Sequence, residues 1–310
     1  MIYNNSQKKA VMHTTGPMMV LAGPGSGKTA VITGRTCQLT ASGISASRIL
    51  VVTFTRAAAK EMKERYLKAM GKTSTQVTFG TFHGVFYAIL RHTYRMSGNN
   101  ILSEEEKKRL MRELVNHYAR DLEEEDLEEN LAREISTVKN NQIPLEHYYS
   151  ACMPQEKFRE IYEAYEKWRK ENKKLDFDDL MVQCKRLFLE RPEVLRAWQQ
   201  KFQYILIDEF QDISPAQYEI VRMLALPENN LFIVGDDDQS IYQFRGAKPE
   251  IMLNFPKDYP GAAQVVLDKN YRSTEFIVKR SQCLIHHNKK RYEKAISTDN
   301  EKGAPVAIRG

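Results

Sequence analysis

The 310-residue sequence has little cysteine, and its four cysteines are scattered. Cys37, Cys152, Cys184 and Cys283 form no C-x-x-C pair, so neither a zinc site nor a disulfide framework fits their spacing. No apolar run approaches the ~20 residues that span a bilayer, and the N-terminal residues lack the apolar core of a signal peptide. These absences favour a cytoplasmic protein with reduced thiols and no membrane span.

Positive charge exceeds negative charge, but unevenly along the chain. The formal net charge is +6. Residues 103–135 contain 12 acidic side chains and 6 Lys or Arg, a local net charge of −6, which leaves +12 for the rest of the chain. A basic body suits a polyanionic partner such as nucleic acid, whereas ordinary solubilising charge is the alternative.

Short apolar runs alternate with helical patterns over much of the chain. The strand-like runs are MMVLA, ILVVTF, VTFGTF, YILIDEF, LFIVGD and AQVVLD, and each precedes a helical pattern. Continuous apolar strands are typical of a parallel sheet covered on both faces. The alternation therefore predicts a doubly wound α/β fold. Between about residues 96 and 191 the sequence is charged and helical, which predicts an all-helical insertion.

The segment VLAGPGSGKTAVITGR has the pattern of a phosphate-binding loop between a strand and a helix. Its glycines allow backbone N–H groups to turn toward phosphate oxygens, and the helix that follows points its positive end at them. The lysine would reach the β- and γ-phosphates of a nucleoside triphosphate, and the threonine would bind Mg²⁺. An alanine stands where the pattern usually begins with glycine, and a glycine-rich turn that binds nothing is the alternative. The residues of the candidate loop are Ala22, Gly23, Pro24, Gly25, Ser26, Gly27, Lys28 and Thr29.

A pair of acids follows the strand-like run YILI. Asp208 could hold the same Mg²⁺ as Thr29, and Glu209 could orient and deprotonate an attacking water. Phosphoryl transfer depends mainly on such positioning and charge neutralisation. A solvated turn is the alternative for an isolated Asp-Glu pair, but a phosphate loop in the same chain favours a catalytic pair.

Eight motifs now give the chain a family resemblance. They are NSQKKAV, AGPGSGKT, VVTFTRAAAKEM, FGTFHG, LDFDDL, LIDEFQDIS, VGDDDQSIYQFRGA and NYRST, in this order. The chain resembles the superfamily-one DNA helicases of the UvrD, Rep and PcrA type. The resemblance implies a RecA-like P-loop domain of parallel α/β type (residues 1–96 and 192–272) with an all-helical insertion (97–191). Residues 273–310 resemble the start of a second RecA-like domain whose remainder is missing.

The resemblance also implies roles around the nucleotide. Gln7 would read the adenine edge through its amide, and Tyr271 would stack on the adenine. Arg272 would point at the γ-phosphate and stabilise charge in the transition state. Arg35 is a further candidate near the phosphates, with a helix surface charge as the alternative.

On the DNA side, Phe54 and Thr55 follow a strand, at the edge where α/β sheets bind ligands. Phe54 would face a base or cap the core, and His83 would lie against DNA phosphates. We interpret LDFDDL as a helix start with an Asp cap, with Phe177 in the core.

The segment VGDDDQSIYQFRGA combines three acids with aromatic residues and an arginine. By resemblance, its aspartates face the nucleotide, and Gln239 hydrogen-bonds the γ-phosphate or the attacking water. Tyr242 and Phe244 would stack on unpaired bases and Arg245 would contact the DNA backbone. A core-packing cluster is the alternative for the aromatic residues.

The resemblance therefore implies an ATP- and Mg²⁺-dependent motor that moves 3′ to 5′ on single-stranded DNA and unwinds duplexes at junctions, in repair or replication. We expect a monomer, and an isolated N-terminal part that unwinds poorly. Two alternatives stay open. One is the motor part of a recombination helicase–nuclease, and the other is a nucleotide-gated DNA-binding module without unwinding activity.

Overall fold

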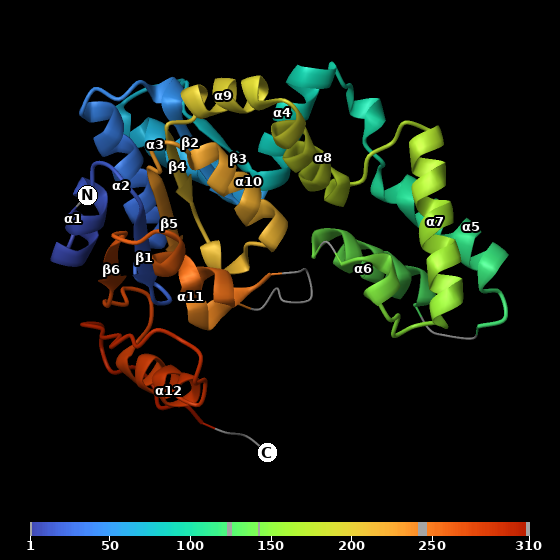
Figure 1. Cartoon of the computed structure of the whole chain (residues 1–310). Coiled ribbons are helices and arrows are strands. Elements are labelled where there is room, and N and C mark those ends of the chain that lie inside the picture. The colour runs from blue at the N-terminus through green and yellow to red at the C-terminus, as the bar shows by residue number, and fades with distance from the viewer. Residues whose placement is uncertain (1, 123–125, 142, 241–246, 308–310) are drawn as a thin grey trace.

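A six-stranded, all-parallel sheet forms the centre of the chain, as the alternating pattern predicts (Figure 1). The computed structural model describes all residues except 1, 123–125, 142, 241–246 and 308–310. The strand order is β3-β2-β4-β5-β1-β6. The strands are β1 (Met18–Ala22), β2 (Ile49–Thr53), β3 (Thr78–Thr81), β4 (Tyr204–Ile207), β5 (Leu231–Gly235) and β6 (Ala263–Leu267).

The central strands are short aliphatic runs because both of their faces are covered. Every residue of β1, β2, β4 and β5 is buried, whereas the edge strands β3 and β6 are partly exposed. Since all strands run the same way, their carboxyl ends meet at one edge of the sheet. The segments after β1, β4 and β5 therefore converge there, and they carry the phosphate loop, the acid pair and the aspartate run.

Helices cover both faces of this sheet. One apolar cluster joins the sheet to α1 (Asn5–Met12), α2 (Lys28–Ala41) and α3 (Arg56–Met70). The cluster on the other face draws its helical residues from α4 (Phe82–Tyr94), α8 (Phe177–Glu190), α9 (Pro192–Lys201), α10 (Pro215–Ala225) and α11 (Pro249–Asp258). In the part of the chain that the structure describes, no helix is both long and apolar enough to cross a membrane.

The insertion has an apolar core of its own. The helices α5 (Glu104–Tyr118), α6 (Leu127–Asn140) and α7 (Gln155–Glu171) form a lobe beside the sheet, drawn in green in Figure 1. Their buried cluster extends from Leu102 to Tyr165. By contrast, α8 and α9 pack against the sheet. The division in packing therefore falls before α8, earlier than the boundary at residue 191 that the charge pattern suggested.

The end of the chain returns to the sheet domain. After α12 (Glu275–Ile285), Ser297 forms a parallel bridge with Lys269, just beyond β6. Lys294 is 7% exposed, and Ile296 lies against the phosphate loop. The assignment of residues 273–310 to the start of a second domain stays a prediction. Residues 299–307, however, form no strand, and residues 291–297 pack on the first domain.

Candidate nucleotide site and adjoining cleft

The phosphate loop connects the carboxyl end of β1 to the start of α2. Gly25 and Gly27 have φ of 65° and 89°, in the left-handed region that favours glycine. The Ser26 hydroxyl donates to the Gly23 carbonyl at 2.6 Å, which closes the turn. Because α2 begins at Lys28, the N–H groups of its first turn have no partner within the helix. The loop therefore has the conformation that an anion site needs.

Two later segments of the chain enclose this loop. A Cβ atom at Gly25 would lie 2.7 Å from Cβ of Arg272, and one at Gly23 would lie 2.5 Å from Cδ1 of Ile296. Asn270 donates to the Pro24 carbonyl at 2.7 Å. The loop glycines are thus required by close packing as well as by backbone conformation.

Gln7 and Tyr271, the candidates for the adenine, both contact the phosphate loop and Asn4. The Gln7 side chain donates to the Ser26 carbonyl at 2.9 Å and also accepts from the Asn4 N–H in a capping box. Tyr271 is 48% exposed, and its hydroxyl accepts from the Asn4 side chain at 2.8 Å. A single polar chain therefore joins the two candidates, and the Tyr271 ring is free to stack.

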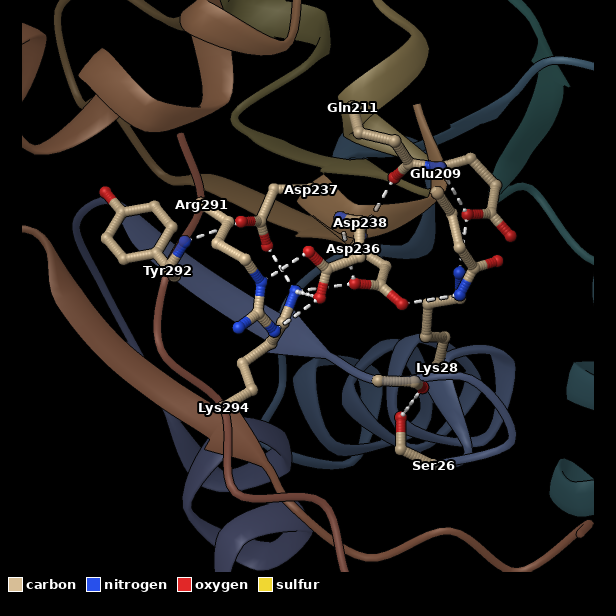
Figure 2. Close-up of polar contacts among 12 residues, drawn as sticks. Ser26, Lys28, Glu209, Gln211, Asp236, Asp237, Asp238, Arg291, Tyr292 and Lys294 are labelled. Atoms are coloured by element: carbon tan, nitrogen blue, oxygen red, sulfur yellow. Dashed lines mark hydrogen bonds and ion pairs between the residues drawn. The ribbon is translucent and has the colours of Figure 1, made fainter. Parts of the chain in front are cut away.

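The acid pair after β4 faces Lys28. The Lys28 ammonium lies 2.6 Å from Oε2 of Glu209. Glu209 has φ of 51°, an uncommon value for a residue other than glycine and one often found at functional sites. The structure thus brings the phosphate-loop lysine and the candidate catalytic acid together across the edge of the sheet (Figure 2).

Asp208 has the properties of a metal ligand. It is 4% exposed, and its Oδ1 atom has no hydrogen-bond partner among the described residues. Burial, together with the charge of Glu209, raises the pKa of Asp208 to about 7. Asp208 and Thr29 line the same cleft. An unpaired buried carboxylate oxygen and a nearby hydroxyl fit Mg²⁺, which prefers oxygen ligands.

Two further polar residues in this loop were not singled out from the sequence. Gln211 donates to Glu209 at 2.9 Å and accepts from the Asp236 N–H at 3.0 Å. Asp212 has a buried Oδ1 atom without a partner in the described structure. Burial and the charge of Glu209 raise the pKa of Asp212 to about 6. Gln211 and Asp212 follow the acid pair closely in the sequence DEFQD, and this closeness is the signal that could have identified them.

The aspartate run after β5 lies against the C-terminal segment of the chain. Lys294 and Arg291 pair with the carboxylates of the three aspartates 236–238, which joins this run to the C-terminal segment (Figure 2). The predicted orientation of the aspartates toward a nucleotide stays a prediction. Gln239 lines the cleft with Asp208 and Glu209. Its amide donates to Oδ2 of Asp236 at 2.5 Å.

Arg35 does not lie at the phosphate loop. Its guanidinium is buried over the Phe232 ring, 4.6 Å from the centroid, and donates to the Thr14 carbonyl. Burial lowers the pKa of Arg35 to about 10. Seven residues separate Arg35 from Lys28, which is about 10 Å along a helix. The helical spacing therefore carries Arg35 past the loop and under the sheet, whereas the exposed Arg272 stays beside Gly25.

A cleft of about 1100 Å³ lies between the edge of the sheet and the helical insertion. Phe54, Thr55 and His83, the described DNA-binding candidates, line it. Phe54 contacts the Phe82 ring edge-on, so it also caps the core. Thr55 caps α3 by accepting from the Ala58 N–H. Each candidate thus has a structural contact and an accessible side in the cleft.

His83 and Phe177 meet inside this cleft. Their rings are 5.6 Å apart and nearly perpendicular. Burial lowers the pKa of His83, which favours the neutral form of its imidazole. Asp176 caps α8 as predicted. The core position predicted for Phe177 is wrong, because the side chain is 39% exposed.

The remaining DNA-binding candidates lie outside the described residues. Tyr242, Phe244 and Arg245 belong to the segment 241–246, on which the structure gives no account. Their predicted roles stay predictions.

Comparison with known proteins agrees with the geometry. Residues 3–260 match the UvrD/REP helicase N-terminal domain family. The chain is 43% identical over 300 residues to the putative ATP-dependent DNA helicase YjcD of Bacillus subtilis. The aligned region covers 94% of this chain and 39% of that protein. It is 39% identical over 311 residues to the ATP-dependent DNA helicase PcrA of Leuconostoc citreum (98% of this chain, 41% of that protein).

A similar likeness extends to PcrA of Staphylococcus aureus, at 36% identity over 314 residues, 98% of this chain and 42% of that protein. The chain spans about 40% of the length of these relatives. The match covers the phosphate loop, the acid pair and the cleft described above. The chain therefore belongs to the UvrD/REP helicase N-terminal domain family.

Proposed function

We propose that this chain is the N-terminal ATP-binding part of an ATP-dependent DNA helicase that moves 3′ to 5′ on single-stranded DNA. One observation carries the proposal: Thr29, Asp208, Glu209 and Gln239 line the same cleft as the DNA-binding candidates. Because both candidate sites line one cleft, a change in the bound nucleotide can alter the contacts with a DNA strand over a short distance.

The nucleotide half would act through charge and position. Lys28, now paired with Glu209, would move to the β- and γ-phosphates when ATP binds. Glu209 would then be released to orient and deprotonate the attacking water. Arg272, beside Gly25, would stabilise negative charge on the transferred phosphoryl group. Gln7 and Tyr271 would hold the adenine.

Thr29 and Asp208 would hold Mg²⁺, which when bound neutralises phosphate charge during transfer. The orphaned Oδ1 atom of Asp208 is the observation that supports this assignment. A positive ion there would also favour the ionised form of a carboxyl whose pKa burial raises to about 7.

The strand-binding half would use stacking. Phe54 and Phe177 present aromatic faces in the cleft, and base stacking tolerates any sequence at about 1–3 kcal/mol per base. Tyr242, Phe244 and Arg245 are proposed to extend this surface. Lysines and arginines of the insertion, including Lys107, line the opposite wall. We also propose single-stranded/duplex junctions as substrate, a monomeric state and a cytoplasmic location.

The test is steady-state ATP hydrolysis with Mg²⁺, with and without single-stranded DNA. It uses the complete protein that contains this chain and, in parallel, the 310-residue chain. We expect DNA to stimulate turnover of the complete protein by at least about tenfold, and we expect the 310-residue chain to unwind poorly or not at all. Lys28→Ala in each background is the blank.

The outcomes separate the proposal from its alternatives. DNA-stimulated turnover together with strand separation supports a helicase. DNA binding that changes with ATP while turnover stays at the Lys28→Ala level supports a nucleotide-gated binding module and overturns the proposal. The polarity follows from unwinding substrates that carry only a 3′ or only a 5′ single-stranded tail.

A further inference from the structure

Lys294 is a buried cation that belongs to none of the motifs of the site. Its side chain is 1% exposed, and its ammonium lies 2.6 Å from Asp236, 2.5 Å from Asp237 and 2.9 Å from Asp238. Burial acts to lower the pKa of Lys294, but the three carboxylates raise it above its usual value. The lysine is therefore charged where it lies.

Two neighbours of Lys294 bind the same aspartates. The Arg291 guanidinium forms a bidentate pair with Asp238, both bonds at 2.7 Å. The Tyr292 N–H donates to Asp237 at 2.7 Å. Residues 291–294 thus engage every member of the aspartate run, and we call this segment the strap. Without it, three buried or half-buried carboxylates would repel one another at close range.

One carboxylate, that of Asp236, separates the strap from Gln239, the candidate partner of the γ-phosphate. Oδ1 of Asp236 accepts from Lys294, and its Oδ2 accepts from the Gln239 amide at 2.5 Å. A single carboxylate therefore fixes both side chains. Loss of Lys294 would leave the Asp236 carboxylate without its cation. The Gln239 amide, which donates to that carboxylate, would then no longer be held in place.

The same aspartate continues the network to the phosphate loop. The Asp236 N–H donates to Gln211, whose amide donates to Glu209, and Glu209 pairs with Lys28 (Figure 2). The bonds in this path are 3.0, 2.9 and 2.6 Å long. The strap thus connects the segment after α12 with both acidic and basic groups of the nucleotide site.

We propose that Lys294 is a positioning residue for ATP hydrolysis: it holds Asp236, and through Asp236 the amide of Gln239, where the γ-phosphate requires it. The inference rests on the proposed function, since it assigns a residue to that reaction. It makes the geometry of the site depend on the chain between α12 and residue 298. Displacement of the strap would therefore slow hydrolysis without removing any group that touches ATP.

The experiment compares variants of the complete protein at saturating single-stranded DNA. Lys294→Met removes the charge and keeps the length, and Lys294→Arg restores the charge. We measure kcat and KM for ATP, and Tm for the folded state. Lys294→Met is expected to lower kcat by at least about tenfold while KM changes by less than about threefold. Lys294→Arg is expected to recover part of kcat.

A double-mutant cycle shows whether Lys294 acts through Gln239. The variant Lys294→Met/Gln239→Ala should turn over no more slowly than Gln239→Ala alone. Lys139→Met is the matched control, because Lys139 is also buried among three carboxylates but lies in the insertion. It should lower Tm and leave kcat of the folded protein within about twofold.

Three results overturn the inference while leaving the proposed function intact. The first is an unchanged kcat in Lys294→Met. The second is a double variant whose fold-loss in kcat equals the product of the losses in Lys294→Met and Gln239→Ala. The third is a loss of kcat in Lys139→Met as large as that in Lys294→Met. If Lys294→Met does not fold, Arg291→Met decides, with a fall in kcat of about threefold expected and no change contradicting the inference. Failure of the proposed function differs from all of these, because the wild-type protein itself would lack DNA-stimulated turnover.

Discussion

Lys139 in the helical insertion and Lys294 at the edge of the sheet each lie buried among three carboxylates. Their contacts are closely matched, at 2.7–2.9 Å around Lys139 and 2.5–2.9 Å around Lys294. The partners are Glu166, Asp176 and Asp179 for Lys139, and Asp236, Asp237 and Asp238 for Lys294. The chemistry is the same, so any difference in role comes from what surrounds each cluster.

The carboxylates around Lys139 belong to helix ends and helix faces. Asp176 and Asp179 form the capping box of α8, Glu166 lies on α7, and Tyr165 donates to Asp176 at 2.7 Å. The cluster therefore fastens α6, α7 and α8 together. The cluster at Lys294 fixes a loop that carries Gln239. One arrangement thus supports architecture, and we infer that the other supports chemistry.

The largest predicted effect is at the acid that links the edge network to the phosphate loop. Glu209→Gln should lower kcat for ATP by about a thousandfold or more, because the amide cannot take a proton from the attacking water. Binding of a non-hydrolysable ATP analogue should be retained. The check is turnover and analogue binding on the same preparation, with Lys28→Ala as the comparison. Unchanged turnover would refute the water-orienting role of Glu209.

In the insertion, Lys139→Met is the counterpart of Lys294→Met, and it should lower the free energy of unfolding without slowing ATP turnover. Lys139→Met leaves three carboxylates without their central cation, and breaking a buried ion pair typically costs about 3–5 kcal/mol. Urea unfolding of the 310-residue chain measures this loss. Lys185→Met, which removes a half-exposed pair with Glu219, is the control and should cost less than about 1 kcal/mol. If Lys139→Met matched Lys185→Met, the cluster would not hold the helices together.

Asp208, at the edge of the sheet, should make the stability of the fold depend on pH. Among the described residues, one buried oxygen of Asp208 has no hydrogen-bond partner. Burial raises the pKa of Asp208 to about 7, so its ionisation disfavours the folded state. The stabilisation is full below the unfolded-state pKa and is lost as pH rises through about 7. Without Mg²⁺, Asp208→Asn should therefore gain stability over wild type by about 2–3 kcal/mol between pH 5 and pH 8.

Urea midpoints at the two pH values test this prediction, and the difference between variant and wild type removes the titration of other groups. Added Mg²⁺ should reduce the difference in urea midpoint between Asp208→Asn and wild type at pH 8, because Mg²⁺ would stabilise only the wild-type carboxylate. A variant advantage that does not change with pH would contradict the raised pKa of Asp208.

The smallest predicted effect lies where the two regions face each other. Phe177→Ala should weaken single-stranded DNA binding by about 1–3 kcal/mol, the contribution of one stacking contact. Phe177→Tyr should retain most of the affinity, since it keeps the ring. Fluorescence anisotropy with a labelled oligonucleotide measures both variants. Equal losses in the two variants would show that the ring does not stack on a base.

Much of the fold and the centre of the site could be predicted from the sequence, because local signals carried them. Lys28, Asp208 and Glu209 follow strands whose apolar pattern is visible, and a parallel sheet brings strand ends together. Arg35 and Phe177 were misplaced because a helical position does not reveal which neighbour will cover it. Lys294 gave no signal, since its three partners precede it by more than fifty residues and only the folded chain joins them.

The strap has a practical consequence for dividing this protein into parts. The last sequence motif of the chain, NYRST, ends at Thr274. A fragment that ended there would keep all six strands and the phosphate loop, and would therefore appear complete. It would nevertheless leave the three aspartates at the sheet edge without Lys294 and Arg291. Such a fragment should be prone to local unfolding at the edge that binds nucleotide. A minimal autonomous unit therefore has to extend to about Thr298, beyond the bridge between Lys269 and Ser297.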